Sequence, residues 1–535
     1  MTGPSPSPWS RRRFLGTAGA GVAAFALGAC QDDAGSGPGP SGPSSTSTAP
    51  EASVPTLEPL EPLEHGEPVG DPPFGLGVAS GDPDHESVVL WTWVDRDPVA
   101  PVPVLAEVAL DEGFTEIVAR EELAAEPGAA MTARLLLGGL APDTRYWYRF
   151  VLDGHVTPPA RTRTAPAPGA MPEAPLRVGH LSCQRWSSGY WTALGDVADQ
   201  APDVVVHCGD YIYVDDRGEV RPVEPAPPTD LDGYRAVWRR YKAEPQLQAA
   251  HAVAPWLVTW DDHEVENNYQ GDTPVDPSDA DGFLDLRAAA YRAWWEFTPT
   301  RVGPPDGASM RTHRVVDWGA LTRFVLLDTR QHRDDQPCDD DVGTDLGRRC
   351  DDTATTTMLG GEQEAWFDQV ATGHDAVWTT VVQQVVVHQW RFAPGNVVWN
   401  LDQWDGYTGA RRRLLETLAR SPTPVVLSGD VHSSWVADLH LDADDGESAL
   451  VAAEFVAPGI SSDIPARLRQ AAPLIQAQSD HIAWAETTRR GWVLHELGAD
   501  AWRTAYRLVD DVSVPDGTVA EETTWELSPS RPGLA

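Results

Sequence analysis

The sequence predicts an α/β domain preceded by a small all-β domain. From Leu176 onward, short apolar runs typical of buried strands alternate with stretches of helical pattern. Between Phe74 and about Pro166, short alternating runs are instead separated by turn residues and no helical pattern intervenes. The first pattern indicates a largely parallel sheet with crossover helices, and the second indicates a β-sandwich.

The N-terminal part carries three predicted segments before the α/β domain. Residues 1–30 have the form of a twin-arginine export signal, with Arg11 to Arg13, an apolar run and a lipobox-like end at Cys30. Residues 31–66 are rich in Pro, Gly, Ser and Thr and predict a disordered tether. Residues 67–165 are the β-sandwich, of fibronectin-III-like type because a Gly-Leu-Ala-Pro-Asp-Thr corner precedes Tyr146. We expect export, to the cell envelope or beyond it, with Cys30 either lipidated as a membrane anchor or removed with the signal.

Charge and cysteine usage narrow the class of protein. With 40 Lys+Arg against 80 Asp+Glu, the formal net charge is -40, which argues against a nucleic-acid-binding surface. Cys338 and Cys350 flank an acidic, polar segment and predict a loop disulfide in an exported protein.

The predicted catalytic domain covers residues 176–512, and residues 513–535 are assigned to a C-terminal tail. Helices are expected over 190–200, 231–252, 280–295, 361–372 and 409–420. The predicted strands end in polar residues, and such carboxyl ends meet at one edge of an open sheet, where ligands bind. These strand-end residues are Cys183, Asp210 with Tyr213, Asp261 to Glu264, Asp328 to Arg330, His388, and Asp430 with His432. Together they indicate a metal centre, of the kind that a two-metal phosphoester hydrolase needs.

At this point the chain resembles the PhoD-type alkaline phosphatases, a branch of the calcineurin-like metallophosphoesterases. The resemblance runs from Phe74 to about Val512, and the segments that carry it include FGLGVASGDPDHESVVLWTWV, LSCQRWSSGYW, VVVHCGDYIY, LVTWDDHEVENNYQGD, LLDTRQHR and LSGDVHSSW. It implies a four-layer α/β/β/α metallophosphoesterase sandwich behind the all-β domain. It also implies hydrolysis of phosphate mono- or diesters by attack of a metal-bound hydroxide on phosphorus.

The same resemblance implies the metal ligands. An iron(III) ion (Fe3+) would be held by Cys183, Asp210, Tyr213 and His432, with Asp210 as the bridging carboxylate. One or two calcium ions (Ca2+) would take oxygen ligands from Asp262, Asn267 and Asp430, and less directly from Asp261 and Asn268. His263 is the candidate that stabilises or protonates the leaving alkoxide. Arg185, two residues after Cys183, is a candidate cation for the phosphoryl oxygens, with a surface arginine as the alternative.

Several residues are given structural roles. His388 is expected to be a hydrogen-bonded neighbour of the site rather than a ligand, with Gln384 at the position equivalent to a metal ligand in related enzymes. We expect Arg330 to clamp loops through carboxylates. The default for Trp390, Trp399, Trp404 and Tyr407 is packing, with a lid over substrate as the rarer alternative.

Three functions remain open at the level of sequence. The first is an exported phosphomonoesterase and phosphodiesterase of broad range. The second is a phospholipase D-like or cell-wall phosphodiester hydrolase. Loops 215–229 and 395–409 set how closed the pocket is, and thereby the preference for monoesters or diesters. The third is a non-catalytic envelope binding protein, which the intact set of strand-end residues argues against. We expect a monomer.

Overall fold

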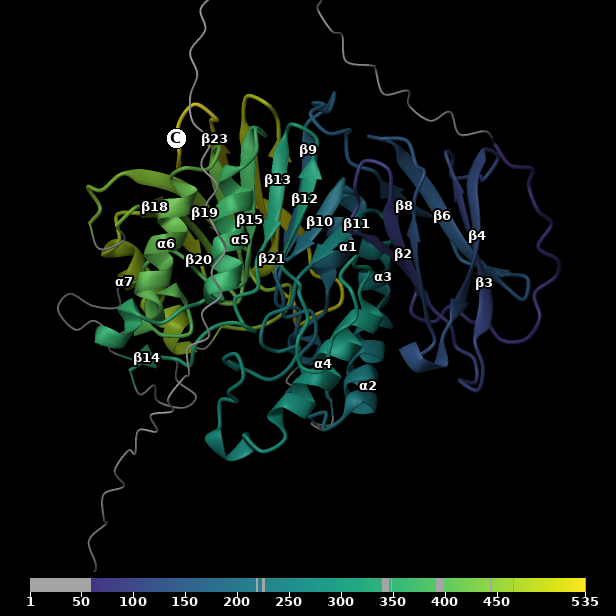
Figure 1. Cartoon of the computed structure of the whole chain (residues 1–535), viewed down its shortest axis with the longest axis horizontal. Helices are drawn as coiled ribbons and strands as arrows, with labels where there is room; N and C mark the ends of the chain where they lie inside the picture. Colours follow the sequence, from purple (N-terminus) through teal and green to yellow (C-terminus); the bar gives the residue numbers. More distant parts are fainter. Residues whose placement is uncertain are drawn as a thin grey trace, which may run out of the picture. The chain divides into compact units, whose positions relative to one another are not determined.

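The computed structural model describes residues 59–217, 220–223, 227–338, 346–347, 349–390, 399–442, 445–464 and 466–534 (Figure 1). The predicted export signal with Cys30, and the predicted tether up to residue 58, lie outside the described residues. Within these ranges, none of the helices is both long and apolar enough to span a bilayer.

Two large sheets carry the catalytic part of the chain. The first has nine strands in the order β23 (Val519–Leu527), β22 (Trp502–Val509), β21 (Arg490–Leu497), β9 (Leu176–Leu181), β10 (Val204–His207), β11 (Pro255–Val258), β1 (Val78–Gly81), β2 (Val88–Trp93) and β5 (Thr132–Leu137). The second has seven, in the order β12 (Arg314–Trp318), β13 (Thr322–Leu326), β15 (Trp378–Val382), β17 (Pro424–Ser428), β19 (Leu450–Val456), β18 (Ser434–His440) and β20 (Ile482–Glu486). The central strands β9, β10 and β11 are mutually parallel, as are β13, β15 and β17.

The two sheets pack face to face, and their strands are apolar on both sides. Val204 and Val206 of β10 join the cluster that includes Phe324 of β13 and Val425 of β17. Val205, which points to the opposite face, packs instead with the first group of helices. This explains why β10 reads as a continuous apolar run rather than an alternating one.

Helices cover the two outer faces and complete four layers. On the first sheet lie α1 (Thr192–Gln200), α2 (Leu231–Lys242), α3 (Pro245–His251) and α4 (Phe283–Phe297), and on the second lie α5 (Gly360–Thr372) and α6 (Thr408–Leu418) (Figure 1). A further helix, α7 (Ala466–Ala477), packs beside β20. Short 3-10 turns are η1 (Pro127–Ala129), η2 (Trp186–Ser188), η3 (Pro277–Asp279), η4 (Asp351–Ala354) and η5 (Trp404–Gly406). The predicted α/β/β/α sandwich is therefore confirmed.

The predicted all-β domain is present, but one of its sheets is shared with the catalytic domain. A five-stranded sheet contains β4 (Ile117–Ala125), β3 (Val102–Ala109), β6 (Arg145–Leu152), β7 (His155–Val156) and β8 (Ala160–Arg163). It packs against β2 and β5, whose own sheet continues through β1 into β11 in parallel register. The β-sandwich therefore extends the catalytic sheet.

Three features differ from the sequence-based expectation. The helix expected over 231–252 is two helices, because Pro245 starts a new one after Glu244. The segment 513–535, which we assigned to a tail, contains β23, an edge strand of the first sheet. Helix α7 was not expected.

The expected disulfide between Cys338 and Cys350 is present. Near it, β14 (Leu346–Gly347) pairs with β16 (Trp399–Asn400). The disulfide-bonded loop is thereby joined to the segment just before Asp402.

Candidate metal centre and active site

The strand-end residues of both sheets lie at one edge of the sandwich. Cys183 follows β9, Asp210 follows β10 and Asp262 follows β11, while Asp430 and His432 follow β17. Since neighbouring strands within each central group run parallel, their carboxyl ends meet at the same edge. The sequence therefore brings these side chains together through strand order.

Several of these residues have a left-handed backbone. The φ angles are 56° at Cys183, 57° at Asp210, 66° at Asp430 and 55° at His432. For residues other than glycine such angles are uncommon and gather at functional sites. Gly209 has a φ of 110°, and a Cβ at this position would lie 2.5 Å from the backbone nitrogen of Asp261. The turn after β10 thus requires glycine next to Asp210.

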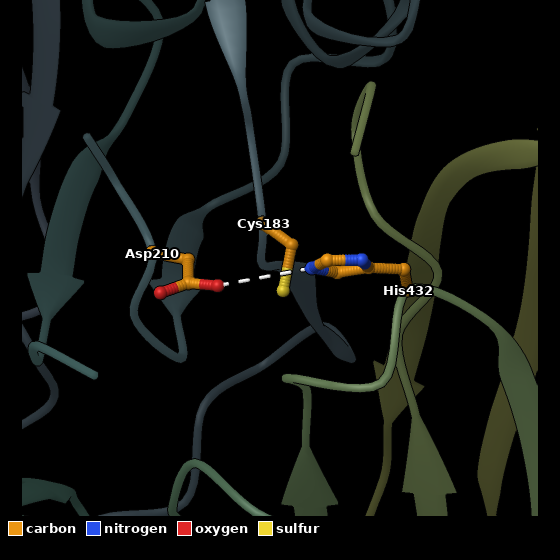
Figure 2. A group of neighbouring side chains, drawn as sticks. All are labelled: Cys183, Asp210 and His432. Carbon is orange, nitrogen blue, oxygen red and sulfur yellow. Dashed lines mark ion pairs between the residues drawn. The ribbon is translucent and has the colours of Figure 1, made fainter. Parts of the chain in front are cut away.

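Cys183, Asp210 and His432 form one cluster, in which the first two are buried and His432 is half-buried, with candidate ligand atoms all within 4.8 Å of one another. Figure 2 shows the three side chains converging from separate strand ends. The Tyr213 hydroxyl donates to Asp210 Oδ2 at 2.6 Å and lies 3.0 Å from His432 Nε2. The ring of His432 is oriented from its other side, where Nδ1 lies 2.9 Å from the Asp463 carbonyl.

The donor atoms of this cluster fit a highly charged cation. Burial, with a contribution from Asp210, raises the pKa of the Cys183 thiol well above its ordinary value. Burial and Asp210 likewise raise the pKa of Tyr213 well above its ordinary value. Neither group would ionise at neutral pH without a strong positive charge beside it. A thiolate, a phenolate, an imidazole and a carboxylate suit a transition metal such as iron.

A second cluster, beside the first, is made of carboxylates. Asp210 groups with Asp261 and Asp262, and their ligand atoms also lie within 4.8 Å of one another. Asp261 Oδ2 and Asp262 Oδ1 are buried without a hydrogen-bond partner. Such oxygens are costly to bury unless a cation is bound, and an all-oxygen donor set suits calcium. Burial is also the main cause of the raised pKa of Asp262.

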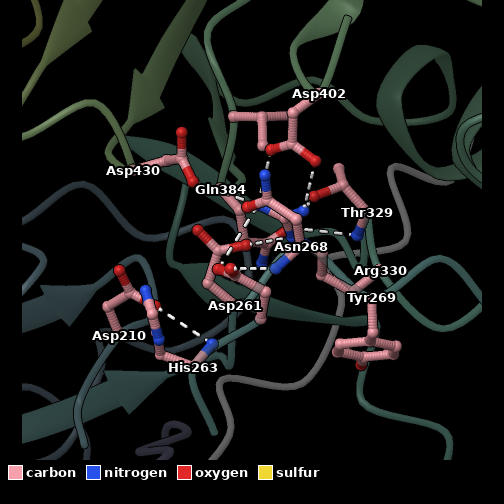
Figure 3. A network of polar contacts seen from close by, with 12 residues as sticks. Asp210, Asp261, His263, Asn268, Tyr269, Thr329, Arg330, Gln384, Asp402 and Asp430 are labelled. Atoms are coloured by element: carbon pink, nitrogen blue, oxygen red, sulfur yellow. Dashed lines mark hydrogen bonds and ion pairs between the residues drawn. The ribbon is translucent and has the colours of Figure 1, made fainter. Parts of the chain in front are cut away.

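Of two adjacent asparagines, the structure brings the second to the carboxylates. Asn267, the predicted ligand, is exposed. Asn268 is buried, has a φ of 54°, and its backbone nitrogen donates to Asp262 Oδ2 at 2.6 Å. Figure 3 shows its side chain among Asp261, Arg330 and Gln384. The predicted Asn267 therefore lies outside this cluster, whereas Asn268, which the sequence offered as the lesser alternative, lies beside it.

His263 and Arg185 both lie against the ring of Tyr213. The His263 ring centroid is 4.2 Å from that of Tyr213, and the Arg185 guanidinium lies 4.3 Å from the same ring. Both side chains also face Asp215, whose Oδ1 is 3.0 Å from His263 Nδ1 and 3.4 Å from Arg185 Nη2. Burial disfavours a charged His263, but Asp215 and Asp262 outweigh this and raise its pKa to about 9.

Sequence reasoning assigned no role to Asp215, and it named Glu264 only as the last residue of the strand-end run Asp261 to Glu264. Asp215 had a signal, because it lies two residues after Tyr213 in the same strand-end loop. Glu264 is fully enclosed, and its carboxylate accepts backbone N–H groups of Asp210 at 3.2 Å, Tyr211 at 2.6 Å and Asp261 at 2.8 Å. It therefore connects the loops after β10 and β11.

His388 is a structural residue, as expected. Its Nδ1 lies 2.7 Å from Glu454 Oε2, and its Nε2 accepts from Trp390 Nε1 at 2.8 Å. The side-chain oxygen of Gln384 accepts a hydrogen bond from the Thr329 backbone N–H at 3.0 Å. Trp404 and Tyr407 are buried in the core beneath α6, which supports the packing alternative for these two aromatics.

Two family models match the chain. The model described as PhoD-like phosphatase covers residues 178–506, and the one described as PhoD-like phosphatase, N-terminal domain, covers residues 61–166. Alkaline phosphatase D of Bacillus subtilis (strain 168) is 36% identical over 484 residues, which is 86% of this chain and 82% of that protein. A solved structure described as "Structure of PhoD" aligns with a TM-score of 0.81 at 35% identity, over 87% of this chain and 92% of its own.

Fold, site and relatives together define a hydrolase of phosphoric esters. The chain belongs to the PhoD-like phosphatase family. Its substrates are phosphoesters, and the alternative of a non-catalytic envelope protein loses its support.

Proposed function

We propose that this hydrolase works with one iron(III) ion and calcium, held at the two clusters described above. Cys183, Asp210, Tyr213 and His432 would hold iron, and Asp262, Asn268 and Asp430 would hold calcium, with Asp210 shared between them. The observation that carries the proposal is the convergence of a thiol, a phenol, an imidazole and a carboxylate in one cluster. When bound, the cations would supply Lewis acidity toward water and positive charge against the phosphate oxygens.

The protein's own groups would guide the leaving group and the phosphate. Asp215 faces Nδ1 of His263 and stabilises a proton there, which leaves the second proton of the imidazolium on Nε2 for the departing alkoxide. Arg185, fixed against the Tyr213 ring and Asp215, adds a guanidinium beside the phosphoryl oxygens.

Metal content and visible absorption of the purified mature protein test this proposal, with Cys183→Ala as the variant. We expect about one equivalent of iron, one or more of calcium, and a visible charge-transfer band that the variant loses. Cys208→Ala is the matched control, because this second buried free thiol lies outside both clusters. Zinc or manganese alone, with a spectrum that Cys183→Ala leaves unchanged, would mean that the ligand assignment is wrong.

We also propose that the protein is exported by the twin-arginine route and retained through a lipid on Cys30. The supporting observation is the order of Arg11 to Arg13, an apolar run and Leu-Gly-Ala-Cys in the first thirty residues. Cell fractionation of the wild type and Cys30→Ala tests it. Protein that leaves the membrane fraction only in the variant supports the anchor, and equal release of both contradicts it.

A further inference from the structure

Arg330 directs its guanidinium toward four carboxylates. The side chain has no exposed surface. Nε donates to Asp261 Oδ1, and Nη1 and Nη2 form a bidentate pair with Asp402 at 2.8 and 3.0 Å. Nη2 also lies 3.0 Å from Asp430 Oδ1 and 3.4 Å from Asp262 Oδ1. Figure 3 shows the guanidinium between these acidic groups.

This contact pattern is that of a bound cation. A guanidinium presents several donors in one plane and is always charged, so it can satisfy carboxylates from different loops at once. The residues that it touches overlap with the proposed calcium ligands, since Asp262 and Asp430 belong to both sets.

The remaining donors divide the cluster into two sides. Asp402 also accepts hydrogen bonds from Arg333 and from Gln336, the latter at 3.1 Å. Asp430 Oδ2 accepts from Gln403 Nε2 at 2.6 Å. On the other side, Asp261 Oδ2 has no hydrogen-bond partner and Asp261 groups with Asp210 and Asp262. Besides Arg330, which contacts all four carboxylates, Arg333 adds a second positive charge at Asp402.

We propose that Arg330 is a resident cation that takes the place of a further divalent ion between Asp261, Asp402 and Asp430. It thereby restricts calcium to the side of Asp210 and Asp262, and Asp430 contacts both the guanidinium and the calcium that we propose there. This inference rests on the proposed function, because it assumes that the carboxylate cluster holds calcium. Arg330 is in this sense a residue that determines the number and position of the metal ions.

Counting calcium in wild type, Arg330→Gln and Arg333→Gln tests the inference. Elemental analysis after exhaustive dialysis, together with calorimetric titration of calcium into chelator-treated protein, gives the number of equivalents. We expect Arg330→Gln to bind one equivalent more than the wild type, because the vacated space is lined by carboxylates. Arg333→Gln is the matched control: it is also buried and binds Asp402, but its ion pair is with that carboxylate rather than with Asp261, Asp262 or Asp430. Its calcium count is expected to equal that of the wild type.

The outcomes separate this inference from the proposed function. A wild type that binds no calcium overturns both. A wild type with calcium, and an Arg330→Gln variant with the same count, overturns only the role of Arg330. If Arg330→Gln is unstable without metal, we expect millimolar calcium to restore the folded state, since the ion replaces the lost charge. The proposal is contradicted if calcium does not stabilise the Arg330→Gln variant and the variant binds no more calcium than the wild type.

Discussion

Individual residues at this site are held in place by neighbours that do not themselves bind metal. His263 is the clearest case, because its Nδ1 lies 3.0 Å from Asp215 Oδ1. Asp215 also faces Arg185, so one carboxylate contacts the two groups to which the proposed mechanism assigns roles toward the substrate. Removing the charge of Asp215 should therefore weaken protonation of the leaving group more than it weakens metal binding.

We expect Asp215→Asn to lower turnover of an alkyl phosphate by about 100-fold, the smaller end of the range for general acid catalysis. The amide no longer stabilises a protonated imidazole. A nitrophenyl ester, whose leaving group needs no proton, should lose much less. Steady-state kinetics on the two substrates with metal-loaded enzyme measure the difference. Equal losses on both substrates would assign Asp215 to another role.

Lys242 is the one lysine in the sequence, and it is buried. Its Nζ lies 3.2 Å from His251 Nε2 and 4.7 Å from the Trp91 ring. Burial lowers its pKa from 10.5 to about 7. Between these two values the unfolded chain binds a proton that the folded protein lacks, so this group makes the free energy of unfolding rise with pH. Below pH 7 both states are protonated, and the penalty for burying the charge is complete.

Lys242→Met should therefore be more stable than the wild type below pH 7, by roughly 3–5 kcal/mol, because each tenfold loss of proton affinity on folding costs about 1.36 kcal/mol. The contact with the Trp91 ring reduces this figure, because an aromatic face stabilises an ammonium ion. The advantage should shrink as pH rises toward 10. Denaturant unfolding across this range measures it. Selective ¹⁵N-lysine NMR gives the pKa directly, and a value near 10 would refute the argument.

The residues that sequence could predict are those fixed by strand order. Cys183, Asp210, Asp430 and His432 each follow an apolar run, and parallel strands bring such positions to one edge. Asn267 and Asn268 could not be separated, because an irregular loop has no period that assigns its side chains to a face. The orienting roles of Asp215 and Glu264 could not be predicted, because such a role depends on the position of a partner that the sequence does not give.

At the scale of elements, the loops after β10 and β11 are joined by Glu264. Its carboxylate accepts three backbone N–H groups from the two loops. This arrangement holds the backbone that carries Asp210 and Asp262, so the spacing of these two carboxylates depends on a third, inward-facing one.

We expect Glu264→Gln to lower the free energy of unfolding by about 2–3 kcal/mol, because the amide group would turn N–H donors toward backbone N–H donors. The measurement is chemical unfolding in the presence of a chelator at pH 9. This pH is chosen because burial and Asp210 raise the pKa of Glu264 to about 8, so the carboxylate is ionised at pH 9. Glu266→Gln is the control. Glu266 is half-buried and accepts one N–H, from Val275 at 3.1 Å, so a loss under about 1 kcal/mol is expected. Similar losses in the two variants would contradict the proposed link between loops.

Element boundaries were harder to predict where polar residues alternate at a sheet edge. β23 is mostly exposed along its length, and its charged and polar residues read as a tail. Its place in the sheet comes from pairing with β22, which is a long-range contact. The break between α2 and α3, in contrast, follows from Pro245 and was visible in the sequence.

At the scale of the whole molecule, the two predicted domains share a sheet. β1 pairs with β2 on one side and with β11 on the other, so hydrogen bonding runs without a gap from the N-terminal strands to the catalytic strands. A Cβ on Gly81 would lie 2.1 Å from the Pro299 carbonyl, which shows how closely the backbone approaches there. Such continuity favours one cooperative unfolding unit.

Asp82, directly after β1, tests this cooperativity. The buried side chain accepts from Arg314 Nη2, from the Thr300 hydroxyl and from the Arg301 backbone, each at 2.8 Å. Asp82→Ala leaves Arg314 without its buried partner, so we expect the free energy of unfolding to fall by about 3–5 kcal/mol. Because the sheet is shared, the loss should shift one transition that circular dichroism and tryptophan fluorescence report together.

The control for this measurement is Arg96→Ala, which breaks a partly exposed ion pair with Asp153 at 3.3 Å inside the N-terminal part. That change should cost under about 1 kcal/mol. If the two probes instead separate in the wild type, and Asp82→Ala moves only the earlier transition, the N-terminal strands unfold on their own. The pairing of β1 with β11 would then be a contact between two independent domains rather than the centre of one sheet.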